Sequence, residues 1–544
     1  MLRQIAPTKP NCYRLSFRRI IWYLSFMVVR STNLNFQLWM GRRHIESCIL
    51  HNHFLSILQR RKPMTPDVSA ALLGVDPAAI TRALLALWAG KIAIAASRTF
   101  GHGGSNFPGK LARRIDPTLT GKLAGRNQQG VLVVTGTNGK TTTARMLSSV
   151  LSYAGFKVTH NRSGANLAGG IASALVEAAP WFPRKSIANG VGILEVDEAA
   201  LVRVAKDLKP RVVVVTNFFR DQLDRYGELI HMVNLVQQGI EEAAASKVVL
   251  NADDPAAAKL GEECGDKALF YGIADDSLGG TESFRAADLR HCVHCGFPYE
   301  YSVIFYSHLG HYRCPRCGHQ RPSPSIALEK AALTPNGYQL KITTPSGPVE
   351  AEVPVVGVYN LYNAIASTAA ACAIGTPLET IAQGLERYTA SFGRMESLHV
   401  QNRELRVALV KNPVGFDQVI TVLLASPTTT PRHLLLAIND LVADGTDISW
   451  LWDVDFERLG PASGTFGDIV CSGIRAEDIA LRLQYAGFPP DKICIENDLA
   501  TALKRAIAST PVEERLWICP TYTALLQLRH LLHRHGEAKG FWEV

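Results

Sequence analysis

The sequence lacks an uninterrupted apolar run long enough to span a bilayer, which takes about 20 residues. Its first apolar stretch, Ile20–Val29, follows two arginines as in a signal peptide, but Arg30 ends it after ten residues and no small-residue cleavage site follows. The longer stretch Pro77–Phe100 carries Lys91 near its middle, which costs about 2.5–3.5 kcal/mol inside a membrane. We therefore expect residues 77–100 to form a buried or interfacial helix and not a transmembrane one.

Outside its first 62 residues the chain has almost no net charge. Those residues hold 11 of the 57 lysines and arginines and one of the 48 acidic residues, so the remainder carries 46 basic and 47 acidic side chains. A neutral body removes the general argument for a nucleic-acid partner. We expect residues 1–76 to be a basic extension that is disordered or, with a start near Met64, not translated; a weak membrane-surface arm is the alternative.

The 11 cysteines lack the pattern of a disulfide framework, because four stand in two Cys-x-x-Cys pairs and the others are scattered. Such usage is typical of a reducing compartment. Eighteen residues separate the two pairs, a spacing typical of a zinc ribbon, here over residues 288–321. Four thiolates leave no open coordination position, so we expect structural zinc on Cys292, Cys295, Cys314 and Cys317. Nearby histidines are possible substitutes, namely His294, His308, His311 and His319.

Residues 131–143 predict a phosphate-binding loop. Four apolar residues indicate a buried strand, and a turn flanked by glycines then leads into a helix. In such a loop the glycines let backbone amides face an anion, the lysine contacts the β- and γ-phosphates, and the next threonine holds Mg²⁺. Lys140 and Thr141 occupy those positions. Val134 stands where the standard P-loop has glycine, so the motif is a variant of it.

Strand and helix patterns alternate after this loop, which predicts an α/β fold with a parallel sheet and crossover helices. Ligands of such sheets bind at the carboxyl ends of the strands. Glu195 is the best candidate for a second Mg²⁺ contact, since a phosphate-bound Mg²⁺ takes only one or two carboxylates. Each polar residue at this edge is equally consistent with a helix cap, but their common position favours function: Glu195, Asp197, Asn217, Asn251, Asp253 and Asp254.

The remaining chain divides into further segments. We expect a helical segment at 77–129, a central ATP-binding domain at 130–398 that contains the ribbon, and a doubly wound, Rossmann-like domain at 399–544. Asn360–Asn363 is expected to cap an Ala-rich helix. In the last domain, an acidic loop and a helix are expected between strands at 434–438 and 468–471.

Five motifs, in order, resemble the nucleotide-binding blocks of the Mur ligases, which use ATP to turn a carboxylate into an acyl phosphate. The resemblance runs from about residue 77 to the C-terminus. The ribbon, Glu195–Glu198 and Asn439–Asp453 more narrowly resemble the MurT family, the ligase-like subunits of lipid II isoglutaminyl synthase. The five motifs are Thr135-Gly-Thr-Asn-Gly-Lys-Thr-Thr142, Asn217-Phe-Phe-Arg-Asp-Gln-Leu-Asp-Arg-Tyr-Gly227, Asn251-Ala-Asp-Asp-Pro255, Gly357-Val-Tyr-Asn-Leu-Tyr-Asn-Ala364 and Gly393-Arg-Met-Glu396.

The resemblance implies a carbon–nitrogen ligase of peptidoglycan synthesis, acting in the cytoplasm at the inner face of the membrane. It would amidate the α-carboxyl of D-glutamate in the lipid II stem peptide, using ATP, Mg²⁺, Zn²⁺ and ammonia from a GatD-like glutaminase. It implies catalytic roles for Lys140, Glu195 and Asp447, the last orienting the partner's histidine; by itself Asp447 is equally a helix N-cap. The nucleotide contacts that it implies are Gly136, Thr137, Asn138, Gly139, Lys140, Thr141, Thr142, Asn251, Asp253, Asn360 and Arg394.

Several features of the amino-acid-adding Mur ligases are missing. Gln222 replaces their usual histidine, Gln237 replaces a carbamylated lysine, and Leu409-Val-Lys411 replaces Asp-Tyr-Ala-His. The MurT family shares these losses, which suits ammonia as the nucleophile, although Leu441 and Val442 stand where that family is expected to be more polar. No cysteine lies in a Gly-x-Cys-x-Gly turn, so a glutaminase would be another polypeptide. An amino-acid-adding ligase of the Mur or folylpolyglutamate kind and a nucleotide-binding zinc-ribbon adaptor for nucleic acid remain the alternatives.

Overall fold

The computed structural model describes most of the chain after the N-terminal extension. The described residues are 77–99, 106–161, 165–182, 186–220, 229–245, 247–281, 289–390, 393–425 and 431–534. Internal contacts divide the chain into residues 1–75 and 76–544, and every described residue belongs to the second unit. The predictions made for residues 1–76 and for Gln222 lie outside the described residues.

Three helices precede the first strand: α4 (Pro77–Thr99), α5 (Phe107–Ile115) and α6 (Leu119–Ala124). In the described part of the chain, one helix, at 78–98, is long and apolar enough to cross a membrane. Its Ala86 and Leu87 are buried in the core, while Ile80 and Leu85 are more than 40% exposed. These contacts agree with a helix that is partly buried and partly at the surface.

The central sheet has nine strands in the order β11-β10-β9-β6-β5-β4-β1-β3-β2. The pairs from β2 to β9 are parallel, and β9, β10 and β11 form an antiparallel extension. The parallel pairing agrees with the α/β class that the alternating pattern predicts. The strands are β1 (Val131–Thr135), β2 (Lys157–His160), β3 (Gly190–Glu195), β4 (Val212–Val215), β5 (Lys247–Asn251), β6 (Ala268–Ile273), β9 (Ile326–Thr334), β10 (Gly337–Thr344) and β11 (Gly347–Val353).

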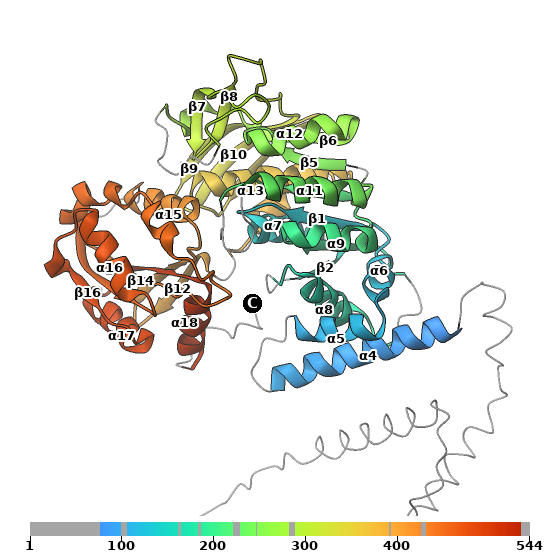
Figure 1. Ribbon diagram of the computed structural model, residues 1–544, viewed down its shortest axis with the longest axis horizontal. Coiled ribbons are helices and arrows are strands. Elements are labelled where there is room, and N and C mark those ends of the chain that lie inside the picture. Colours follow the sequence, from blue (N-terminus) through green and yellow to red (C-terminus); the bar gives the residue numbers. More distant parts are fainter. Residues whose placement is uncertain are drawn as a thin grey trace, which may run out of the picture. The chain divides into compact units, whose positions relative to one another are not determined.

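Helices cover both faces of this sheet (Figure 1). Successive side chains of β1 point to opposite faces, so Leu132 and Val134 pack under one helix layer and Val131 and Val133 under the other. The first layer is α7 (Lys140–Tyr153), α13 (Val358–Ala373) and α14 (Leu378–Glu386). The second contains α8 (Ala168–Ala178), α9 (Glu198–Leu208), α11 (Leu229–Ala243) and α12 (Pro255–Cys264), with α4 to α6 packed against it.

The C-terminal domain is built on a second sheet, in the order β12-β13-β17-β14-β15-β16, with β12 alone antiparallel. Separate apolar clusters on its two faces make it doubly wound, as expected. The predicted boundary after residue 398 falls inside β12, which belongs to this sheet. Its elements are β12 (Arg394–Val400), β13 (Arg403–Ala408), α15 (Pro413–Ala425), β14 (Arg432–Ala437), β15 (Phe466–Ser472), α16 (Ala476–Tyr485), β16 (Ile493–Ile495), α17 (Leu499–Ser509), β17 (Arg515–Pro520) and α18 (Tyr522–Arg534).

Two local predictions were wrong. The N-cap of α13 is Gly357, with a left-handed φ of 83°, and Asn360 and Asn363 lie inside the helix instead of capping it. No α-helix forms between β14 and β15. Glycine and proline account for this only at the end of the segment, in Gly460–Thr465, because residues 446–459 contain neither. Three 3₁₀ segments take its place: η3 (Ser449–Trp452), η4 (Phe456–Arg458) and η5 (Gly460–Thr465).

Candidate functional site

The turn between β1 and α7 can only be made with glycines. Gly136 and Gly139 have left-handed φ values of 113° and 86°. A Cβ atom on Gly136 would lie 2.4 Å from Oγ1 of Thr216, and one on Gly139 would lie 2.2 Å from Oδ1 of Asn363. The turn therefore packs tightly against its neighbours, and it delivers Lys140 at the first position of α7.

Lys140 is buried and surrounded by acceptors. Its Nζ donates to Glu198 Oε1 at 3.0 Å and to the carbonyl of Thr137 at 3.3 Å, and it also contacts the carbonyl of Gly136. Burial alone would lower the pKa of Lys140, but the carboxylates of Glu198, Asp197 and Glu195 outweigh it and raise the pKa above its ordinary value. The Lys140 side chain is thus a cation at the start of α7, just after the turn that follows β1.

Glu198 is a site residue that sequence reasoning did not single out. It occupies the first position of α9 and is 2% exposed. The available signal was its place in the Glu195–Glu198 motif, but only the fold shows that the start of α9 faces the phosphate loop. Glu198 is the counter-ion that holds Lys140 in place.

Thr141 and Glu195, the two residues predicted to hold Mg²⁺, are in direct contact. Thr141 Oγ1 donates to Glu195 Oε2 at 2.8 Å, so the hydroxyl and the carboxylate already face one another. Asn161 fixes the backbone of Glu195 from both sides, accepting from its amide at 2.9 Å and donating to its carbonyl at 2.8 Å. Hard oxygen donors at the start of a phosphate-loop helix fit Mg²⁺.

A pocket opens beside the phosphate loop and brings together five of the predicted nucleotide contacts: Asn138, Gly139, Thr142, Asn360 and Arg394. Its other walls are largely apolar and come from the C-terminal domain as well as the central one, including Tyr306, Tyr359, Met395, Leu409, Val414 and Val419. Asn412 Nδ2 donates to Asn138 Oδ1 at 3.1 Å across these two domains. An apolar slot with a few polar groups next to a predicted phosphate loop has the lining expected of a nucleoside site.

Asn251 and Asp253 do not line that pocket. Both are fully buried, and Asn251 Nδ2 donates to the carbonyl of Thr216. The carboxylate of Asp253 accepts from the hydroxyl of Tyr362 and the amide of Ile273, each at 2.8 Å, and pairs with Arg321. Of the other residues at this sheet edge, Asp197 and Asp254 cap α9 and α12. Asn217 Oδ1 accepts from the amide of Asn138 at 2.9 Å and so braces the phosphate loop.

The four ribbon cysteines meet at one point. Their sulfur atoms all lie within 4.8 Å of one another, with Cys292 to Cys317 and Cys295 to Cys314 each at 3.5 Å. Tetrahedral zinc at about 2.3 Å from each sulfur requires sulfur separations of about 3.8 Å, so the group fits zinc. No disulfide joins the nine cysteines that the structure describes. Although burial raises the pKa of Cys292, backbone amides of His294 and Cys295 donate to it and lower its pKa to about 6.

The two Cys-x-x-Cys knuckles have the same backbone geometry. Gly296 and Gly318 follow the second cysteine of each pair with φ of 71° and 79°, and each donates to the carbonyl of its first cysteine. The glycine that follows each Cys-x-x-Cys pair is a sequence signal for this turn that the prediction of the zinc ribbon did not use. The knuckles flank the small two-stranded sheet of β7 (Glu300–Tyr306) and β8 (Leu309–Arg313). Because all four cysteines converge, no histidine is needed as a substitute ligand.

Asp447 lies in the exposed segment between β14 and β15. Its carboxylate accepts from the amide and the hydroxyl of Ser449 at 2.8 and 3.0 Å, just before η3. These two bonds close a local turn before η3, whose N-cap is Ile448 and not Asp447, and they leave the carboxylate at the surface. Leu441 and Val442 on the same segment are 45% and 81% exposed. Gln237 lies on α11 and donates to Glu241 and Glu263, away from the phosphate loop.

Known proteins resemble the chain in both sequence and fold. The family described as MurT ligase C-terminal matches residues 409–525, and the Mur ligase middle domain matches 134–295. The MurT subunit of lipid II isoglutaminyl synthase (glutamine-hydrolyzing) from Staphylococcus aureus strain COL is 33% identical over 447 residues, 82% of this chain and 97% of that protein. The corresponding Streptococcus pneumoniae subunit is 35% identical over 441 residues, 79% of this chain and 92% of that protein.

Solved structures of peptide ligases share the fold. MurF from Acinetobacter baumannii superposes with a TM-score of 0.57 at 18% identity, covering 79% of this chain and 80% of MurF. A pseudomurein peptide ligase type C from Methanothermus fervidus gives 0.53 at 22% identity, covering 75% and 79%.

Proposed function

The chain belongs to the family of MurT subunits of lipid II isoglutaminyl synthase, and from this premise we propose that it is the ATP-dependent ligase subunit of such an enzyme. It amidates the α-carboxyl of D-glutamate in the stem peptide of lipid II, giving D-isoglutamine. The observation that supports this most is the assembly of Lys140, Thr141 and Glu195 at the loop that borders a largely apolar pocket, which Arg394 lines.

The chemistry requires ATP because a carboxylate has no leaving group. An oxygen of the glutamate carboxylate attacks the γ-phosphorus and ADP leaves; ammonia then attacks the acyl carbon, phosphate leaves, and the nitrogen loses a proton. Lys140 would release Glu198 and neutralise charge on the transferred phosphoryl group, and Arg394 would contact phosphate or ribose. Thr141 and Glu195 would hold Mg²⁺, which would further neutralise the charge of the phosphates.

The other predicted nucleotide residues divide into two groups. Gly136, Gly139 and their neighbours would present backbone amides to the phosphates. Asn251 and Asp253 would act indirectly, because their polar groups hold β4, β6 and α13 behind the loop. Zinc on the four cysteines would be structural, since four thiolates leave no coordination position for a substrate.

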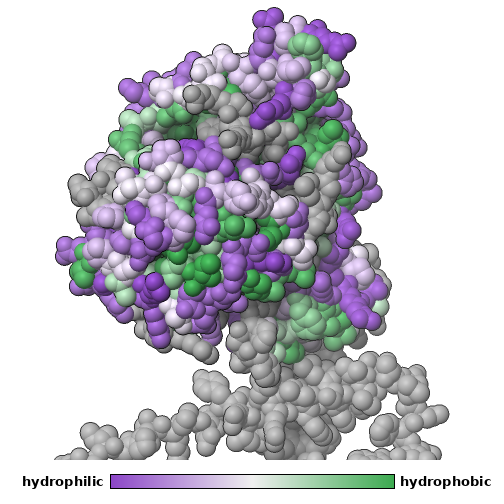
Figure 2. Space-filling model, turned by 60° about the vertical axis from the view of Figure 1, so that its left-hand side comes forward, coloured by the Kyte–Doolittle hydropathy of each residue, from purple (hydrophilic) through white to green (hydrophobic). Residues whose placement is uncertain are grey.

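A glutaminase of the GatD kind is the proposed partner. Ammonia is mostly ammonium at neutral pH, so an amidating enzyme gains from direct delivery. The exposed carboxylate of Asp447 is free to approach a histidine of another chain, where it would fix the imidazole's tautomer and orientation. The exposed Leu441 and Val442 beside it are apolar, as expected for a segment that a partner covers. Figure 2 shows apolar residues interspersed with polar ones on the face of the C-terminal domain.

The lipid-linked substrate places the reaction at the inner face of the cytoplasmic membrane, and the N-terminal helices suit that surface. Residues 77–129 hold eight lysines and arginines and one acid, Asp116. That acid is buried and binds Lys122 at 2.8 Å. Trp181 and Phe182, which contact Trp88 of α4, are 52% and 63% exposed. Basic residues with exposed aromatic rings are typical of a surface that meets anionic lipid head groups.

The test is amidation of lipid II by this chain and its co-purified glutaminase. Lys140→Ala should abolish ADP formation and amidation with either nitrogen source. Asp447→Asn should lose most glutamine-dependent amidation but keep the activity with added ammonium at alkaline pH. Asp453→Asn, an exposed aspartate of the same segment, is the control and should keep both activities.

Glutamine-dependent amidation by Asp447→Asn at the wild-type rate would contradict the role of Asp447. ADP formation with a free amino acid and no partner would instead support the amino-acid-adding ligase.

A further inference from the structure

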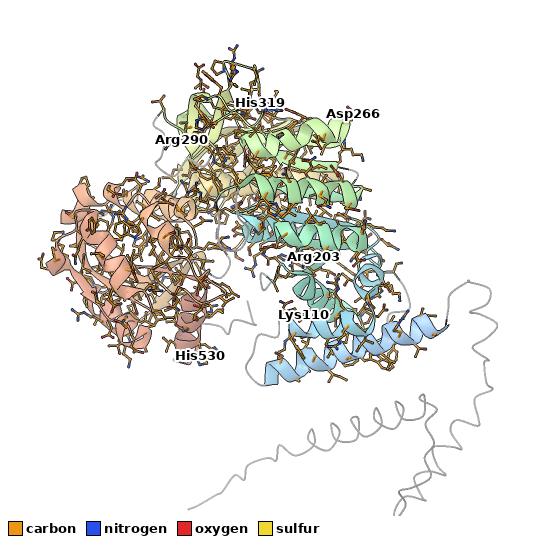
Figure 3. All side chains as sticks on the ribbon, in the orientation of Figure 1. Lys110, Arg203, Asp266, Arg290, His319 and His530 are labelled. Carbon is orange, nitrogen blue, oxygen red and sulfur yellow. The ribbon has the colours of Figure 1, made fainter. Side chains whose placement is uncertain are left out.

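Three potential metal ligands that the four-cysteine site does not use converge beside it. His294 lies inside the first knuckle and His319 directly follows the second, while Glu262 comes from the last turns of α12. Figure 3 labels His319, which lies near α12 on the ribbon. The ribbon and the central domain therefore both contribute to this cluster.

The distances in the cluster are those of ligands around one ion. Glu262 Oε1 lies 3.1 Å from His294 Nε2 and 3.7 Å from His319 Nε2, and the two imidazole rings are 4.5 Å apart at their centroids. Metal bonds of about 2.0–2.2 Å at tetrahedral angles separate neighbouring ligand atoms by about 3.3 Å. The observed separations bracket that value. Glu262 and His294 are also partly exposed, so an ion can enter from solvent.

Tyr299 orients the His319 ring for this role. The Tyr299 oxygen accepts from the amide of Val293 at 3.1 Å and lies 2.8 Å from His319 Nδ1. With His319 Nδ1 donating to this oxygen, the lone pair of His319 is on Nε2 and faces the carboxylate of Glu262, a contact that a cation between them makes favourable.

The geometry points to a second divalent transition-metal site, formed by Glu262, His294 and His319 next to the four-cysteine site. Two imidazoles and one carboxylate suit Zn²⁺ and leave a position for water. The ion would fasten both knuckles to α12. This inference does not depend on the proposed function. The alternative is a metal-free cluster in which Glu262 only accepts hydrogen bonds from the two histidines.

Metal content distinguishes these possibilities. The full chain, with any partner that co-purifies, is equilibrated with micromolar zinc, separated from free metal and analysed by inductively coupled plasma mass spectrometry. We expect about two zinc ions per chain, falling to about one in Glu262→Gln and in His319→Gln. Glu263→Gln, the adjacent exposed carboxylate of α12, is the matched control and should retain about two.

Cobalt substitution shows which site is lost. Cobalt bound to four thiolates gives an intense sulfur-to-metal charge-transfer band, whereas a site of nitrogen and oxygen ligands gives only weak visible bands. The charge-transfer band should persist in both variants while the second equivalent of cobalt disappears. A wild-type chain with about one zinc ion, or unchanged content in Glu262→Gln, would overturn the inference. So would loss of the charge-transfer band in both variants, because the three residues would then only support the four-cysteine site.

Discussion

Asp417 is a buried carboxylate whose ionisation sets part of the stability of the C-terminal domain. It lies on α15, is 2% exposed, and accepts from the amide of Asp455 at 2.8 Å. Burial raises its pKa to about 7. The hydrogen bond from the Asp455 amide opposes this rise, the Asp455 carboxylate adds to it, and Arg458 and Arg482 oppose it. In the unfolded chain the pKa would be about 4.

The free energy of unfolding should therefore fall as pH rises between about 4 and 7, because the unfolded chain loses the Asp417 proton before the folded chain does. Over that window the loss amounts to about 4 kcal/mol. Asp417→Asn, which can still accept from the Asp455 amide, should match the wild type near pH 4 and be more stable at pH 8. Urea unfolding across this pH range measures the difference. Asp491→Asn, an exposed control, should leave the profile unchanged; an Asp417→Asn profile parallel to the wild type would refute the assignment.

The positions of individual site residues were predictable from the sequence where a local motif fixes the backbone conformation. Gly136, Gly139, Lys140 and Thr141 follow from the strand-turn-helix pattern, since such a turn permits few arrangements. The pairing of Lys140 with Glu198 was not predictable, because it depends on how α9 is placed against α7.

Secondary-structure elements with strong periodicity were predicted well, and irregular segments were not. Strand β1 is one residue longer than expected but occupies the predicted position, because buried β-branched runs are unambiguous. The helix predicted before β15 was wrong, because the short apolar pattern of residues 449–458 fits an α-helix and a succession of 3₁₀ turns equally well. Strand ends placed Asn251 and Asp253 correctly at the sheet edge, but the sequence could not show that β6 and the ribbon cover them.

The ribbon sheet of β7 and β8 should depend on its metal for order. A two-stranded sheet is marginal by itself, and zinc binding to such a module contributes directly to folding. Chelation, or Cys295→Ser, should raise amide exchange in residues 300–313 while the neighbouring strand β10 stays protected. Hydrogen exchange measured by mass spectrometry tests this, with metal content determined on the same sample. Cys494→Ser, a partly buried cysteine outside the ribbon, should change neither; unchanged exchange in β7 after proven loss of zinc would refute the dependence.

The molecule as a whole has the Mur ligase fold, with an uneven distribution of charge along the chain. The sequence predicted that the chain after residue 62 has almost no net charge. That average conceals the basic segment 77–129, which is recognised as one segment only when α4 to α6 are seen in the structure. The nucleotide pocket was predictable in part: its central-domain wall comes from recognisable motifs, whereas Met395, Leu409 and Val419 have no signature and are assembled by tertiary packing.

The basic segment should bind anionic membranes. In a chain starting at Met64, which removes the other basic tract, Lys110→Glu with Arg114→Glu should weaken sedimentation with phosphatidylglycerol vesicles by at least about tenfold, since each charge near the surface contributes about 1 kcal/mol. Both residues are exposed on α5. Arg203→Glu on α9 is the matched control; Lys110 and Arg203 are labelled in Figure 3. Equal binding by the double variant and the control, or binding that resists high salt, would argue against this surface.

Asp253 connects two parts of the central domain that have separate tasks. One of its oxygens faces Arg321, which leads out of the ribbon, and the other accepts from Tyr362 of α13, the helix that carries Asn360 and Asn363. Because the carboxylate is fully buried, neither partner can leave without exposing an unpaired charge to an apolar interior. The ribbon and the nucleotide helix should consequently open and close as one cooperative unit. Metal occupancy at the edge of the domain would then alter the rigidity of the ATP pocket without any change in the residues that line it.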